Sequence, residues 1–314
     1  MNSADFETLN ELKQYFSENC KNLVFSNEMT LDNDVRAKMY YVKVDEIIEK
    51  NNYKKIFQEY LILYARSYEK LRYFKQRSED LSVDLIEYGK KTWNSGGLIV
   101  NTNIESAGIF GELFNDFYLN IVKNENILLT YSSRRGASEK NVKGVDVVGC
   151  TCENKNLTLI YSESKFVDSA SAAQRALRND INGTDREDAH INAEYINKFT
   201  IFLLDKNHSL YNDSDENTEI IINTIDSMND KIYNGQEPIE VFNELGVKIR
   251  FVFFAIYTDN MFTPKQREAY YKNILLDFYN QISKTGINNY DIEIVFIPII
   301  SKSKEIKEHM CKWD

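Results

Sequence analysis

The sequence predicts an α/β fold in which helices flank a mixed β-sheet. Two extended segments, 143–149 and 157–165, are separated by a polar turn and predict an antiparallel hairpin. Further along, strand-like segments at 248–257 and 291–300 enclose a helical segment at 264–284, which is the order of a parallel β-α-β unit. A sheet that holds both an antiparallel hairpin and a parallel unit is mixed.

Hydrophobic spacing predicts the remaining elements. In the N-terminal third we expect a strand and two helices, at 36–44, 53–74 and about 83–93. The glycine pair at 96–97 suggests a boundary between an α-rich N-terminal extension (1–97) and a second domain (98–314). In that domain we expect a helix, a strand and a second helix, at 104–122, 127–131 and from 170 to at least 178.

Composition limits the classes of protein to which the chain can belong. Its 314 residues can bury the core of one large or two small domains. No segment approaches the roughly 20 apolar residues of a membrane helix, and the N-terminus lacks the features of a signal peptide, so we expect a cytoplasmic protein without membrane contact. Cys150 and Cys152 read as reduced strand residues, because only three histidines accompany them and no zinc spacing appears.

An acid and a lysine interrupt the apolar face of the second hairpin segment. Residues two apart in a strand share a face and lie roughly 6.6 Å apart, so Glu163 and Lys165 should project together beyond Leu159 and Tyr161. Asp146 sits on the preceding segment, where the hairpin would bring it close to them. Charged side chains that continue an apolar face break a local rule, and such breaks are expected at functional sites.

These residue types suit metal-dependent phosphodiester hydrolysis. Asp146 and Glu163 would supply the hard oxygen ligands that Mg²⁺ or Mn²⁺ prefers, and leave coordination positions for water and phosphate. Lys165 would hold the attacking water or neutralise developing negative charge. The alternative is a surface hairpin on which Glu163 and Lys165 are solvated or paired with neighbours.

Other residues are candidates for supporting roles. Glu112, next to Gly111 on the helix before the strands, is either a third acidic ligand or a solvated residue, with Asp116 as its substitute. The arginines Arg134 and Arg135 lie in a charged loop that could follow a phosphate backbone. On the helix after Lys165, we expect nucleic-acid contacts from Gln174, Arg175 and Arg178, with simple solvation or salt bridging as the alternative.

In order, Glu112, Asp146 and Glu163-Ser164-Lys165 resemble the PD-(D/E)xK nuclease superfamily, although Asp146 follows a valine where the literal pattern has proline. More narrowly, the segments 111–114, 144–149 and 163–166 resemble the HamA nuclease family of the Hachiman antiphage defence system. This resemblance implies a PD-(D/E)xK-like core, a metal-dependent DNA nuclease effector, and a superfamily 2 helicase partner (HamB-like) that restrains it.

The net charge of −10 argues against high autonomous affinity for nucleic acid, and a helicase partner that delivers DNA would accommodate it. The leading hypothesis is therefore a DNA nuclease that works with such a partner. Two alternatives stay open: a non-catalytic adaptor whose acidic surface docks onto a helicase, and a metal-dependent RNase toxin that uses the same site.

Overall fold

The structure is a computed structural model that describes residues 14, 18, 28–29, 37–41, 111–112, 114–119, 146–184, 189, 191–194, 196–197, 216–258 and 263–299. Several predictions lie outside the described residues: the helices at 53–74 and about 83–93, the glycine pair at 96–97, the strand at 127–131, and the loop that carries Arg134 and Arg135.

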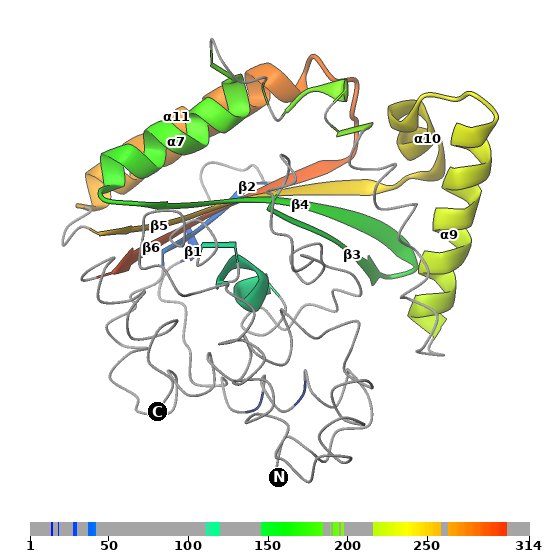
Figure 1. Ribbon diagram of the computed structural model, residues 1–314, viewed down its shortest axis with the longest axis horizontal. Helices are drawn as coiled ribbons and strands as arrows, with labels where there is room; N and C mark the ends of the chain where they lie inside the picture. Colours follow the sequence, from blue (N-terminus) through cyan, green and yellow to red (C-terminus); the bar gives the residue numbers. More distant parts are fainter. Residues whose placement is uncertain are drawn as a thin grey trace, which may run out of the picture.

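A mixed sheet of six strands organises the described residues, in the order β1-β2-β6-β5-β4-β3 (Figure 1). Neighbouring strands are parallel from β2 through β6 and β5 to β4, while β1 and β3 are antiparallel to their neighbours. The strands are β1 (Glu28–Met29), β2 (Ala37–Tyr41), β3 (Val147–Glu153), β4 (Asn156–Val167), β5 (Lys248–Thr258) and β6 (Tyr290–Ile299). The predicted α/β class and mixed sheet are confirmed.

The predicted hairpin is present as β3 and β4, with a shift in the first strand. Asn154 and Lys155 form its two-residue turn with φ values of 50° and 66°, and paired positive φ values are what a tight type I′ hairpin turn requires. The turn sets a register in which Val147 lies opposite Ser162. The strand therefore begins at Val147, and Asp146 occupies the bend just before it and not the strand interior.

The predicted β-α-β unit is confirmed as β5, α11 (Pro264–Ile282) and β6. α11 begins with a capping box, in which the Thr263 hydroxyl accepts from the Gln266 amide and the Gln266 side chain accepts from the Thr263 amide. Such reciprocal bonds satisfy amides that a helix start leaves without partners. β5 is buried along nearly its whole length, which explains its continuous apolar run.

Helices cover both faces of the sheet. α7 (Ala170–Asn182) and α11 lie side by side on one face, whereas a short helical segment at 111–119 lies on the other (Figure 1). α9 (Glu216–Tyr233) packs beside the β3–β4 hairpin, and α10 (Pro238–Leu245) packs against α9. None of the described helices combines the length and the apolar character needed to cross a membrane.

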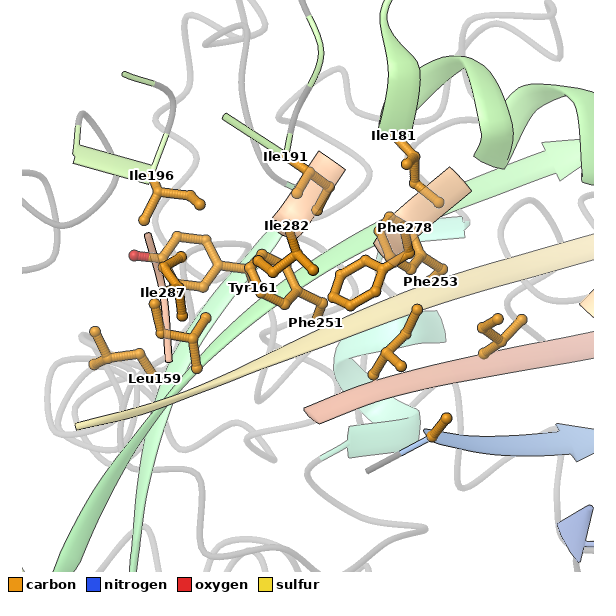
Figure 2. Close-up of a cluster of buried hydrophobic side chains, with 14 of the residues drawn as sticks. Leu159, Tyr161, Ile181, Ile191, Ile196, Phe251, Phe253, Phe278, Ile282 and Ile287 are labelled. Atoms are coloured by element: carbon orange, nitrogen blue, oxygen red, sulfur yellow. The ribbon is translucent and has the colours of Figure 1, made fainter. Parts of the chain in front are cut away.

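The main core lies between the sheet and the pair α7 and α11 (Figure 2). Phe278 of α11 is central to it, with its ring centroid 5.3 Å from that of Phe251 and 6.3 Å from that of Phe253. On the opposite face, the ring centroid of Phe114 in the 111–119 segment lies 6.0 Å from that of Phe254. β4 and β5 are therefore buried on both faces, and packed strands are a better support for a site than loops.

The N-terminal third contributes to this same sheet. The strand expected at 36–44 is confirmed as β2, and it pairs in parallel with β6. The boundary at residue 97 and the α-rich character of the residues before it stay predictions.

Candidate functional site

Asp146 is anchored to the middle residue of the Glu163-Ser164-Lys165 triplet. The Ser164 amide and hydroxyl both donate to Asp146 Oδ2, at 2.7 and 2.8 Å. Continuing the hairpin register by one residue beyond Val147 places Asp146 across from Glu163. Two hydrogen bonds to a single carboxylate oxygen fix its orientation, and hydrogen bonds to a charged acceptor are stronger than neutral ones.

Glu163 and Lys165 project together from β4 toward α7. They continue the side of the strand that carries Leu159 and Tyr161, which belong to the core under α7 and α11. The Lys165 ammonium lies 3.9 Å from Glu163 Oε2. Glu163 is nearly buried, whereas the Lys165 side chain keeps 27% of its surface exposed, so an exposed edge of the cluster remains at the lysine.

A third carboxylate, that of Asp180 on α7, completes the surroundings of Lys165. Asp180 Oδ2 lies 2.9 Å from the Lys165 ammonium, which is the shorter of the lysine's two ion pairs. We did not predict Asp180 from the sequence, although a signal was present. It occupies a buried helix position in line with Ala173, Leu177 and Ile181, and a carboxylate within an apolar stripe is rarely buried unless it is paired.

These carboxylates determine the charge on Lys165. Burial lowers the pKa of the lysine, but the negative charges of Glu163, Asp180 and Asp146 together outweigh burial and raise the pKa above its ordinary value. Nearby opposite charge favours the ionised form of a group. Lys165 is therefore an ammonium at neutral pH, able to donate hydrogen bonds and unable to act as a base.

The helical segment at 111–119 packs on the other face of β4. A Cβ on Gly111 would lie 3.4 Å from the Ser164 hydroxyl oxygen and 3.5 Å from Phe166 Cβ, so the helix comes as close to the strand as an alanine would allow. Farther along, Asn115 donates to the Ser162 hydroxyl, which donates in turn to the Val252 carbonyl. The helix therefore packs against Ser162, Ser164 and Phe166 of β4, whose side chains alternate along the strand with those of Glu163 and Lys165.

Glu112 follows the close contact at Gly111 and is half-buried. The contacts of its helix are to the Ser162 and Ser164 side of β4, whereas Glu163 and Lys165 project to the α7 side. Among the described residues, no three or more His, Cys, Asp or Glu side chains form a group that could hold a metal ion. The third-ligand role of Glu112 stays a prediction, and its proposed substitute, Asp116, is fully buried.

The residues expected to contact nucleic acid on α7 differ in their surroundings. Arg175 is exposed and Gln174 is half-buried. Arg178 forms an ion pair with Asp277 of α11, so it links the two helices. The salt-bridging alternative is thus seen at Arg178, and binding to nucleic acid there would require that ion pair to open or to be shared.

The described cluster therefore consists of two carboxylates at the hairpin, Asp146 and Glu163, and an ammonium held between Glu163 and Asp180. Two carboxylate groups can suffice for Mg²⁺, which typically uses one or two protein carboxylates and retains several waters. The donor set is hard oxygen alone, which disfavours the soft metals that select cysteine.

Comparison with protein-family models gives a match to the family described as HamA over residues 14–312. A comparison with curated proteins gives no significant match. The family match covers nearly the whole chain, including β2 and the hairpin, and confirms the family predicted from the motifs.

Proposed function

Because the chain belongs to the HamA family, a component of the Hachiman antiphage defence system, we propose that it is a metal-dependent nuclease that hydrolyses DNA. The observation that carries the proposal is the meeting of Asp146 with the Glu163-Ser164-Lys165 triplet at the β3–β4 hairpin. Acid, acid and lysine in this order, the first just before β3 and the other two on β4, also support a PD-(D/E)xK-like core.

Asp146 and Glu163 would hold Mg²⁺ or Mn²⁺. Ser164 tethers Asp146 through Oδ2, so Oδ1 is the oxygen that we assign to the cation. A divalent cation bound there supplies a positioned water of lowered pKa and positive charge near the phosphate. Glu112 would complete the acidic set only by reaching the site past Ser164.

Lys165 would stabilise negative charge on the phosphate. Its ammonium lies 3.9 Å from Glu163 Oε2, and the surrounding carboxylates, which outweigh burial, keep its pKa raised. A fixed positive charge aimed where charge develops in the transition state is the usual source of large rate effects. The ammonium can also donate a hydrogen bond to the attacking water, but removing the proton from that water falls to another group.

DNA would approach over the exposed edge of the cluster, with Arg175 of α7, and with Arg134 and Arg135, as phosphate contacts. The net charge of −10 opposes tight binding to a polyanion without help. We therefore propose that a helicase subunit of the same defence system delivers the DNA and restrains cleavage until it is needed.

Purified protein variants test the catalytic assignment. Asp146→Ala, Glu163→Ala and Lys165→Ala should each abolish Mg²⁺-dependent cleavage of DNA and keep the far-UV circular dichroism of the unsubstituted chain. Matched DNA and RNA substrates should be compared with and without the helicase subunit. Cleavage of RNA alone would replace the proposal with an RNase, and unchanged cleavage in all three variants would exclude the site.

The adaptor alternative makes a different prediction. A non-catalytic adaptor should show no Mg²⁺- or Mn²⁺-dependent thermal shift that disappears in Asp146→Ala. Our proposal predicts that the shift is present in the unsubstituted chain and lost in that variant, whether or not a partner is added.

A further inference from the structure

The ammonium of Lys165 lies between two carboxylates and is closer to the one outside the proposed metal pair. Its distance is 2.9 Å to Asp180 Oδ2 and 3.9 Å to Glu163 Oε2. Only the first distance is within the range of a charge-assisted hydrogen bond. The ammonium therefore lies nearer Asp180, and it is about 1 Å too far from Glu163 Oε2 for a direct hydrogen bond.

This arrangement matters because the lysine and a metal ion would compete for the same oxygens. An ammonium bonded directly to Glu163 would occupy a carboxylate that the proposed function gives to the cation, and would repel a divalent ion at close range. Asp180 is nearly buried, so its charge needs a paired cation. The buried carboxylate thus draws the lysine away from Glu163.

We propose that Asp180 is a positioning residue, which holds the Lys165 ammonium away from Glu163 so that Glu163 can bind the divalent cation. The inference rests on the proposed function for its assignment of Glu163 to the metal. Asp180 is not proposed as a metal ligand, since the described residues contain no group of three acids that could hold an ion. It acts on the metal through Lys165.

A double-mutant cycle on Mn²⁺ affinity separates this role from a general effect of charge. The four proteins are the unsubstituted chain, Asp180→Asn, Lys165→Met and the double variant, each titrated with Mn²⁺ and followed by the electron paramagnetic resonance signal of the free ion. Asp180→Asn should weaken Mn²⁺ binding about tenfold, since the released lysine bonds Glu163 instead. In the Lys165→Met background, Asp180→Asn should change the affinity less than about twofold.

Two further variants control for damage to the fold. Asp277→Asn removes another nearly buried carboxylate, which joins α11 to α7 through its ion pair with Arg178, and it should leave Mn²⁺ affinity unchanged. Asp180→Glu keeps the charge and should retain most of the affinity. Thermal melts of every variant identify any that fails to fold. Asp180→Glu and the double variant then decide the question: the proposal requires near-normal affinity in Asp180→Glu, and an affinity in the double variant within about twofold of that of Lys165→Met.

The outcomes distinguish the inference from the function on which it rests. Equal weakening by Asp180→Asn in both backgrounds would mean that its charge acts directly, and would overturn the inference alone. The same holds if Asp180→Asn binds Mn²⁺ as the unsubstituted chain does. If the chain binds Mn²⁺ but cuts neither DNA nor RNA, the proposed activity fails and the cycle still decides the role of Asp180. No Mn²⁺ binding by the unsubstituted chain would overturn both.

Discussion

Replacing Ser164 with alanine should slow DNA cleavage about tenfold, because Ser164 orients Asp146. The substitution removes the hydroxyl that donates to Asp146 Oδ2 at 2.8 Å and keeps the amide that donates at 2.7 Å. Hydrogen bonds to charged groups contribute about 1.5–3 kcal/mol, and the half-buried position of Asp146 favours the lower end. About 1.4 kcal/mol of lost transition-state stabilisation corresponds to a tenfold slower reaction.

Ser162→Ala is the matched control. Ser162 lies two residues earlier on the same face of β4, where its hydroxyl donates to the Val252 carbonyl at 3.1 Å and accepts from Asn115 at 2.7 Å. Like Ser164→Ala, the Ser162→Ala variant loses a buried hydroxyl, and its free energy of unfolding should fall by a comparable amount, about 1 kcal/mol. It leaves Asp146 untouched, so its cleavage rate should stay close to that of the unsubstituted protein.

The assay is cleavage of a fluorescently labelled duplex at saturating Mg²⁺, with urea denaturation of each variant run in parallel. Full activity in Ser164→Ala would refute the reasoning, because Asp146 would then not need the hydroxyl. An equal loss of activity in Ser162→Ala would refute it as well, since the effect would follow damage to β4 and not the orientation of Asp146.

Three further predictions concern stability. Nearby carboxylates raise the pKa of Lys165 and outweigh the opposing effect of burial, so the stability that this ammonium contributes is present below its ordinary pKa of 10.5 and is lost as pH rises above it. The difference in unfolding free energy between the unsubstituted chain and Lys165→Met should be constant from about pH 6 to about pH 9. A steep change within that window would contradict the account. Tyr118→Phe removes the hydroxyl that donates to the buried Glu293 at 3.0 Å and should cost about 1–3 kcal/mol in urea denaturation, whereas a loss of under about 0.3 kcal/mol would show that the bond is replaced. Lys155→Gly relieves a left-handed turn residue with φ 66° and should stabilise the protein by up to about 1 kcal/mol; a lower melting temperature would contradict this.

Local patterns in the sequence were sufficient to predict the hairpin and the β-α-β unit. The polar turn at Asn154 and Lys155 and the β-branched runs on either side are local signals for β3 and β4. The sequence prediction nevertheless places the first strand too early, because it ends that strand at Gly149. Gly149 is buried in mid-strand opposite Ile160, and the register set by the turn carries β3 on to Glu153.

The surroundings of the site depend on tertiary packing, which the sequence does not show directly. Asp180 reaches Lys165 only because α7 lies across β4, and Arg178 meets Asp277, 99 residues away, only because α7 lies beside α11. Tertiary packing also determines on which face of the sheet the 111–119 segment lies. That face in turn determines from which side Glu112 could reach the carboxylates Asp146 and Glu163. Sequence periodicity gives the buried face of a helix and leaves open which layer it joins.

The most direct test of the account is a crystal structure of the protein soaked in Mn²⁺, with anomalous diffraction used to locate the ion. We predict an anomalous peak between Asp146 and Glu163, with Asp146 still bonded to Ser164 and the Lys165 ammonium still on Asp180. Well-ordered side chains at these positions without a peak between the two carboxylates, or a peak only elsewhere, would contradict the assignment of this site to metal-dependent hydrolysis.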